Sequence, residues 1–274
     1  MEISESVPNS EITFSREGDG SVAVVFVHGF LDDQHIWNQV VAGLDASDVE
    51  TVRLDLAGSG CRTDADGPFT YDRLAADVSA VVDAVGKPFV IVGHSMAAPA
   101  VELVAAARPD QARGLVLVSP IPMDGTQLPD EAIETFRSLG SLGVAELLAV
   151  RQQTAPTAPA TELERVAAAG VKTKPEVVRE LADMWNNGHP TGRQRSDFSG
   201  PVLVLPGAED SLVTAEVLDA KVLNRFDKAN TTVTRIEKSG HWPHLEQAST
   251  IAAEISRFLA ANATRRRPSA GEEQ

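Results

Sequence analysis

The chain contains a single cysteine, Cys61, among its 274 residues, so it cannot form a disulfide within itself. The first six residues also lack the basic start and the apolar segment of a secretory signal. Both absences are typical of a protein in a reducing compartment, and we expect a cytoplasmic location. We interpret Cys61 as a loop thiol and not as a nucleophile.

Long apolar runs and clusters of positive charge are also missing. No stretch approaches the roughly 20 consecutive apolar residues of a membrane span, so we expect no membrane partner. The formal net charge is -15, and the one basic cluster, 265–267, belongs to a polar end, 263–274, that we expect to be a disordered tail. Nucleic acid binding depends on clustered cations, so the charge argues against it.

The sequence also lacks the motifs of a metal or cofactor site. No His-Glu-x-x-His occurs, and Gly58-Ser59-Gly60 lacks the further glycine and the helix of a dinucleotide-binding loop. We therefore expect no cofactor and no metal, and a small molecule as the partner. Nothing in the sequence indicates an oligomeric state.

What the chain does have is a recurring pattern of short apolar runs. Nearly unbroken runs of this length predict parallel strands buried on both faces, and they alternate with segments of helical periodicity. The predicted strands cover 22–27, 51–54, 89–92, 115–118 and 202–205, with a more polar edge strand at 231–236, and the predicted helices cover 71–85, 96–107 and 245–261. This alternation indicates an α/β fold with a doubly wound, mostly parallel sheet.

Residues 122–196 interrupt the alternation. They contain six prolines and no strand-like run, with helical stretches predicted near 130–139, 142–153, 160–169 and 175–186. A helical insertion between two strands would lie over the strand ends, where ligands bind in open α/β sheets. We interpret 122–196 as a helical cap between the two core parts, 1–121 and 197–262. The alternative is an elaborated crossover that does not touch substrate.

One serine is placed where a strand turns into a helix. Gly93-His94-Ser95-Met96-Ala97 follows the predicted strand at 89–92 and precedes a stretch of small residues. Such a corner is the nucleophile elbow of a hydrolase, in which a sharp turn exposes the hydroxyl above the sheet. Gly93 supplies the small residue required before the serine, and Ala97 stands where a second glycine is usual.

Further motifs occur in the order expected after such an elbow, and together they resemble the α/β-hydrolase fold superfamily. The resemblance is carried by His28-Gly29-Phe30, Asp55-Leu56-Ala57-Gly58-Ser59-Gly60, Gly93-His94-Ser95-Met96, Gly207-Ala208-Glu209-Asp210 and Gly240-His241, and it covers residues 11–121 and 197–262. It implies that a nucleophile, an acid and a histidine follow one another along the chain.

A serine hydroxyl needs a base to accept its proton, and an imidazole can do this at neutral pH. Among the histidines, His241 alone lies in the loop after the last predicted strand, and His244 is its rival. The resemblance implies that Asp210 is the acid that orients this histidine. Asp124, after the strand at 115–118, is a second possible origin for the acid.

The resemblance also implies an oxyanion hole made of the backbone amides of Phe30 and Met96. We expect His28 to brace the loop that carries Phe30, and Asp55 to be structural. The substrate pocket is predicted to be apolar. Its candidates are Phe30, Leu31, Met96 and Trp242 with Phe136, Leu147, Leu148 and Trp185 of the cap, whereas the spacing of Trp37 on its helix favours a core position.

These residues predict a serine hydrolase that cleaves a small carboxylic ester or lactone through an acyl-enzyme. The serine at the elbow argues against dehalogenases and epoxide hydrolases, which have aspartate there. Carbon-carbon bond hydrolases, perhydrolases and hydroxynitrile lyases keep the serine and stay open as alternatives. The stretch 29–37 also resembles bacterial stress regulators and plant butenolide-hormone receptors, so a signalling protein with an intact triad is a further alternative.

Overall fold

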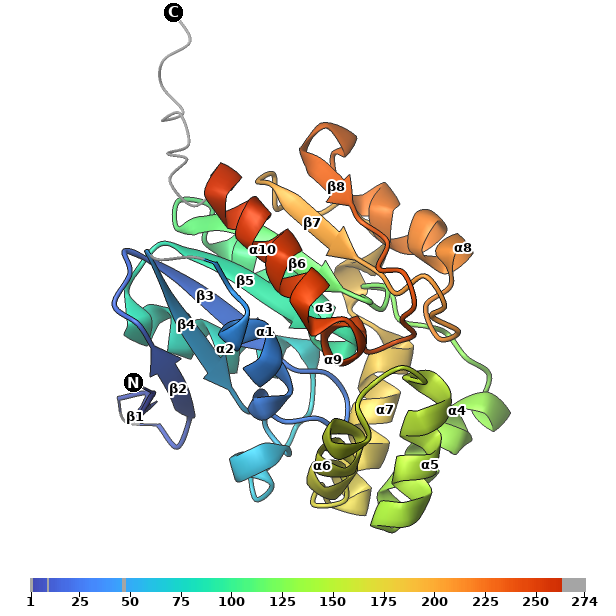
Figure 1. Cartoon of the computed structure of the whole chain (residues 1–274). Coiled ribbons are helices and arrows are strands. Elements are labelled where there is room, and N and C mark those ends of the chain that lie inside the picture. Colours follow the sequence, from blue (N-terminus) through green and yellow to red (C-terminus); the bar gives the residue numbers. More distant parts are fainter. Residues whose placement is uncertain (1, 9, 46–47, 263–274) are drawn as a thin grey trace, which may run out of the picture.

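The computed structural model describes residues 2–8, 10–45 and 48–262. An eight-stranded sheet forms its centre, in the order β1-β2-β4-β3-β5-β6-β7-β8 (Figure 1). The strands are β1 (Ile3–Ser6), β2 (Thr13–Glu17), β3 (Val22–Val27), β4 (Val49–Leu54), β5 (Phe89–His94), β6 (Ala112–Val118), β7 (Val202–Leu205) and β8 (Thr231–Val233). The pairs β1–β2 and β2–β4 are antiparallel, and the other neighbouring strands are parallel.

This arrangement confirms the predicted mostly parallel α/β sheet. Each apolar run forms a strand, and the more polar segment predicted at 231–236 is the edge strand β8, which covers only its first half, Thr231–Val233. Strands β1 and β2 were not predicted, because antiparallel strands near a sheet edge are partly solvated and need no continuous apolar run. The predicted tail, 263–274, lies outside the described residues.

Helices cover both faces of the sheet. Outside the insertion they are η1 (Gln34–Trp37), α1 (Asn38–Ala42), η2 (Gly60–Arg62), α2 (Tyr71–Val85), η3 (Ser95–Ala97), α3 (Ala98–Ala107), α8 (Ala215–Val217), η6 (Leu218–Val222), η7 (Leu223–Arg225), η8 (Lys228–Asn230), α9 (Pro243–Glu246) and α10 (Ala248–Asn262). In Figure 1, α10 and α1 lie in front of the sheet and α2 and α3 behind it.

The two helix layers explain why β3 is apolar at every position. Alternate side chains point to opposite faces of a strand. Val25 and Val27 pack into the core on the α2 and α3 side, whereas Val24 and Phe26 pack into the core that contains residues of α10. All six residues of β3 are buried. A strand covered on both faces cannot show the polar and apolar alternation of a half-solvated strand.

The insertion consists of helical elements in the part of 122–196 that lies between β6 and β7. They are α4 (Asp130–Arg137), η4 (Ser138–Ser141), α5 (Val144–Thr154), α6 (Ala160–Gly170), α7 (Pro175–Asn187) and η5 (Pro190–Arg193). Within 122–196, all of which the structure describes, there is no strand. Figure 1 shows α4 to α7 gathered at one end of the sheet. The segment therefore lies over the loops at that end.

We predict that Trp37→Ala lowers the free energy of unfolding by about 3–5 kcal/mol, because a large core side chain would be replaced by a cavity. Trp37 is fully buried, its ring centroid is 5.2 Å from that of Phe26 and it stacks on His244. Urea unfolding measures the change. The control is Val233→Ala on the exposed edge strand, which should shift stability by less than about 0.5 kcal/mol. Equal effects of the two substitutions would contradict the core assignment.

Candidate active site

Ser95 lies directly after β5 in a strained backbone conformation. Its φ is 50°, in the left-handed region that residues other than glycine rarely adopt. Such strain persists only where the surrounding packing enforces it. A Cβ at Gly93 would lie 2.5 Å from Cγ2 of Val101, so only glycine lets α3 approach β5 this closely. The turn from β5 into η3 and α3 therefore places the Ser95 hydroxyl at the end of the strand.

His241 connects Ser95 to Asp210. Its Nε2 lies 2.8 Å from Oγ of Ser95, and its Nδ1 lies 2.9 Å from Oδ2 of Asp210. With the Nδ1–H donating to the carboxylate, Nε2 is free to accept the proton of the serine hydroxyl. All three residues are buried. The structure thus brings together the three residues that the sequence places in separate loops.

The carboxylate of Asp210 is held ionised. Its Oδ1 accepts hydrogen bonds from the amides of Leu212, at 2.8 Å, and Val213, at 2.9 Å. Burial raises the pKa of Asp210, but the opposite effect of His241 and these amides is larger, so the pKa lies below its ordinary value. An ionised carboxylate at this position holds the Nδ1 proton on the imidazole and can stabilise an imidazolium.

The alternative acid and base lie elsewhere. His244 is fully buried and stacks on Trp37, with ring centroids 4.5 Å apart, and its two ring nitrogens bond to no described residue. Burial holds the pKa of His244 well below its ordinary value. Asp124 lies 3.9 Å from Nζ of Lys221. Neither residue takes part in the contacts of Ser95.

The backbone amides of Phe30 and Met96 have no hydrogen-bond acceptor among the described residues. Phe30 belongs to the loop after β3, and Met96 follows Ser95 in η3. Buried or partly buried N–H groups are usually paired. Phe30 and Met96 line the same cavity as Ser95, so their two unpaired amides are free to bind an oxygen of a ligand there. Leu31, which follows Phe30, has a φ of 57° and shapes the turn of this loop.

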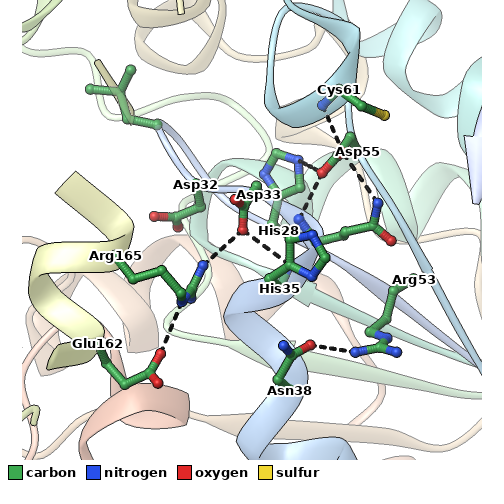
Figure 2. Close-up of polar contacts among 12 residues, drawn as sticks. His28, Asp32, Asp33, His35, Asn38, Arg53, Asp55, Cys61, Glu162 and Arg165 are labelled. Atoms are coloured by element: carbon green, nitrogen blue, oxygen red, sulfur yellow. Dashed lines mark hydrogen bonds and ion pairs between the residues drawn. The ribbon is translucent and has the colours of Figure 1, made fainter. Parts of the chain in front are cut away.

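His28 and Asp55 brace the same loop. Nδ1–H of His28 donates to the carbonyl of Gly29 at 2.9 Å, and its Nε2 accepts from the Leu56 amide at 3.0 Å. Asp55 accepts from the amide of Gln34 at 2.7 Å. It also accepts from the amide of Cys61 at 2.9 Å, as Figure 2 shows. The ring nitrogens of His28 and the carboxylate oxygens of Asp55 thus make hydrogen bonds to backbone groups.

Two arginines of the insertion also bind this loop. Arg165 of α6 donates through Nη1 to Asp33 at 3.1 Å (Figure 2), and Arg151 of α5 donates through Nη2 to Asp32 at 3.0 Å. Asp32 and Arg151 were not predicted as site residues from the sequence. The partners lie 119 residues apart, and neither belongs to a motif that would have pointed to the other.

A cavity of about 350 Å³ opens above Ser95 and His241. Its lining comes from the core and from the insertion: Phe30, Leu31, Ser95, Met96, Ile121, Thr126, Leu128, Ala132, Phe136, Leu139, Leu147, Val150, Arg151, Thr154, Trp185, Ser211, Leu212, Val213, Val217, Lys221, His241 and Trp242. This size is at the lower end of the range for small-molecule pockets, and the walls are mainly apolar.

Leu148 requires a correction. It was predicted to line the pocket together with its neighbour Leu147, but Leu147 lines the cavity and Leu148 does not. Leu148 packs instead against the core cluster that contains Leu163 and Trp242. Successive residues of an α-helix point about 100° apart, so one side chain faces the cavity and the next faces away from it. The other predicted pocket residues, including Phe136 and Trp185, are in the lining.

Within the described part of the chain, no cluster of three or more His, Cys, Asp or Glu side chains could hold a metal ion. None of the helices in these same residues combines the length and the apolar character that crossing a bilayer would require.

Comparison with known proteins relates these features to a family. Residues 24–254 match the profile of the alpha/beta hydrolase family. Lipase LipV of Mycobacterium tuberculosis is 28% identical over 187 residues, which are 68% of this chain and 65% of LipV, so the chain spans about two thirds of that relative. The Karrikin insensitive 2 receptor CA of Petunia hybrida is 35% identical over 111 residues, which are 38% of this chain and 40% of the receptor.

The fold also resembles solved structures. The crystal structure of bromoperoxidase from Bacillus anthracis superposes with a TM-score of 0.79 and 18% identity, covering 95% of this chain and 100% of the other. At this identity the likeness shows a common fold.

We predict that Asp32→Asn lowers the free energy of unfolding at pH 7 by about 3 kcal/mol or more, because it leaves Arg151 buried without its carboxylate. Burial raises the pKa of Asp32, but the opposite effect of Arg151 and His94 is larger, so the pKa lies below its ordinary value of 3.8. A depressed folded-state pKa contributes stability that is complete above pH 3.8 and is lost as pH falls through the folded pKa.

The difference in the free energy of unfolding between wild type and Asp32→Asn should therefore become smaller as pH falls below 3.8. Urea unfolding from pH 3 to pH 7 measures it, and a gap that stays constant over this range would refute the prediction. Asp33→Asn is the matched control, because its pair with Arg165 is partly exposed. Its loss at pH 7 should stay below about 1 kcal/mol.

Proposed function

Because the chain belongs to the alpha/beta hydrolase family, we propose that it is a serine hydrolase that cleaves a small carboxylic ester or lactone through an acyl-enzyme. One observation carries the proposal. Asp210, His241 and Ser95 form a continuous series of contacts, at 2.9 and 2.8 Å, and Ser95 and His241 line an apolar cavity. Lipase LipV, a relative by sequence, supports a lipase-like or esterase-like reaction.

In the first half of the proposed reaction, Ser95 is the nucleophile. Nε2 of His241 accepts the hydroxyl proton while Oγ forms a bond to the carbonyl carbon of the ester. The carbonyl oxygen becomes an anion and accepts hydrogen bonds from the amides of Phe30 and Met96. The bond to the leaving oxygen then breaks, and that oxygen takes the proton from Nε2. The product is an acyl-enzyme and a free alcohol, which in a lactone stays attached to the acyl chain.

In the second half, water takes the place of the alcohol. Nε2 of His241 accepts a proton from water as the water oxygen attacks the acyl carbon. Oγ of Ser95 leaves with that proton, and a carboxylic acid is released. Throughout, Asp210 keeps the imidazole oriented through Nδ1 and stabilises its cationic form. The cycle needs no further group.

The cavity indicates the kind of substrate. Phe136, Leu147 and Trp185 from the insertion face an apolar space of about 350 Å³, which suits a compact, mainly uncharged ester. We therefore propose that 122–196 acts as a cap over the strand ends. The single cysteine favours a cytoplasmic location for this activity.

A second candidate function is ligand-dependent signalling. It is favoured by the 35% identity to the Karrikin insensitive 2 receptor CA of Petunia hybrida, a match that is confined to 38% of this chain. A receptor of this kind would bind a ligand in the same cavity and release product slowly or not at all.

Ser95→Ala should abolish covalent labelling by a fluorophosphonate probe and reduce esterase activity at least about 1000-fold, because no other group replaces the nucleophile. Labelling is measured on gels and activity with p-nitrophenyl butyrate. Ser249→Ala, an exposed serine on α10, serves as the control and should leave both unchanged. Full activity in the Ser95→Ala protein would refute the proposed mechanism.

Turnover separates the two candidate functions. With p-nitrophenyl acetate or butyrate in excess, a hydrolase should release p-nitrophenol steadily over many equivalents of protein, because water regenerates Ser95. The time course of absorbance measures this, and mass spectrometry of the intact protein detects any retained acyl group. A single burst of about one equivalent, with a persistent acyl label, would favour the receptor.

A further inference from the structure

Arg151 is an arginine buried in the wall of an apolar cavity. It lies on α5, its residue exposure is 3%, and it lines the space above Ser95. Nη2 donates to the carbonyls of Phe30, at 3.2 Å, and Leu31, at 2.8 Å, and to Asp32 at 3.0 Å. A long side chain from the insertion is thus attached to the loop that carries the Phe30 amide.

The guanidinium is held in one position. Its Cζ lies 4.2 Å from the centroid of the Trp242 ring, and Nε1 of Trp242 donates to Asp32 at 3.1 Å. Asp32 therefore binds both the arginine and the indole beneath it. A planar guanidinium that is stacked on one side and hydrogen-bonded at one end presents its remaining N–H groups in a fixed direction.

Part of this guanidinium has no partner. Nε is buried and bonds to no described residue, and Nη1 makes no hydrogen bond with the described chain either. Leaving buried donors of a charged group unpaired is unfavourable, and nearly all such groups in proteins find an acceptor. Nε has almost no accessible surface, so a molecule in the cavity cannot reach it. The N–H groups of Nη1 are neither bonded nor fully buried, and because Arg151 borders the cavity, a molecule bound there can supply the acceptor that they lack.

We propose that Arg151 is a substrate-binding residue whose free Nη1–H groups bind a neutral oxygen acceptor of the substrate outside the scissile ester, such as a ketone, ether or second ester carbonyl. This inference rests on the proposed hydrolase function and specifies its substrate class. It predicts that the natural substrate is a bifunctional ester or a lactone with an oxygen substituent, and not a plain hydrocarbon ester.

The charges around the cavity favour a neutral acceptor over a carboxylate. The two basic side chains of the described lining, Arg151 and Lys221, each lie near a carboxylate already, those of Asp32 and Asp124. Asp210 adds a further carboxylate beside His241. A substrate carboxylate would lose its hydration among apolar walls without gaining an unpaired cation. A neutral oxygen loses less hydration and can still accept the hydrogen bonds.

The test uses pairs of esters that differ by one oxygen. On the acyl side, p-nitrophenyl 4-oxopentanoate is compared with p-nitrophenyl pentanoate; on the alcohol side, 3-oxobutyl pentanoate is compared with butyl pentanoate. For each pair, kcat/KM is measured for wild type and for Arg151→Met. The quantity compared is kcat/KM for the oxo ester divided by kcat/KM for the plain ester. This ratio is insensitive to any effect of the substitution that is common to both substrates. The intrinsic reactivity of each ester is the same with both proteins and cancels when their ratios are compared.

In at least one pair, we expect this ratio to fall about tenfold or more in Arg151→Met, the size of effect typical of a lost hydrogen bond to a charged group. The double variant Asp32→Asn with Arg151→Met contains no unpaired buried carboxylate, and its ratio should fall equally. Arg165→Met is the matched control, because Arg165 binds the adjacent Asp33 but does not line the cavity. Its ratio should equal that of wild type.

Two results would overturn the inference. One is an equal ratio in wild type, Arg151→Met and the double variant for both pairs, which would leave Arg151 with only its contacts to the loop. The other is faster hydrolysis of mono-p-nitrophenyl succinate than of the 4-oxopentanoate, with dependence on Arg151, which would make the acceptor a carboxylate.

A binding measurement separates this inference from the proposed function. Calorimetry with the Ser95→Ala protein compares methyl 4-oxopentanoate and 3-oxobutyl pentanoate with methyl pentanoate and butyl pentanoate, before and after Arg151→Met is added. Tighter binding of an oxo ester that requires Arg151, without any Ser95-dependent turnover in wild type, would contradict the hydrolase proposal and retain the oxygen-binding site. Ser95-dependent turnover without any preference for the oxo esters would support the hydrolase proposal and contradict the oxygen-binding site.

Discussion

Parallel pairing of β3, β5, β6 and β7 is the constraint on which the rest of the structure depends. Parallel strands present their carboxyl ends at one edge of the sheet. The loops that follow β3 and β5 therefore bring Phe30 and Ser95 to the same place, and the loop after β7 adds Asp210. The contacts of His241 with Ser95 and Asp210 follow from this geometry. The insertion enters the chain between β6 and β7, so its helices lie over that same edge.

The loop after β3 is where the core and the insertion meet. Asp55 and His28 hold it from the sheet side, whereas Arg151 and Arg165 hold it from the insertion. A loop fixed from both sides holds the Phe30 amide in one position, which is the property that an oxyanion site needs. The cavity walls and the amide are thus positioned by one set of contacts.

Elements with a strong local signal could be predicted from the sequence. The helix at 71–85 is observed with those same bounds, because Thr70 accepts from the Arg73 amide at its start and Gly86, with φ 67°, ends it. The weakly patterned strands β1 and β2 were missed, since β2 is held by pairing with β4 and β1 by pairing with β2, and not by an apolar pattern of their own. The sequence also could not predict that Leu147 and not Leu148 lines the cavity, because this depends on how α5 is rotated against the core.

The sequence by itself determined the order of the strands and helices along the chain, the serine at a strand end and the loops that carry Asp210 and His241, because apolar periodicity and turn residues act locally. Only the tertiary structure decided which donors and acceptors meet. Arg151 and Asp32 are joined across 119 residues, and their contact is set by the packing of α5 against the β3 loop. Such pairs arise from the complete arrangement of the chain, since desolvation leaves each buried charge dependent on whichever partner the fold brings to it.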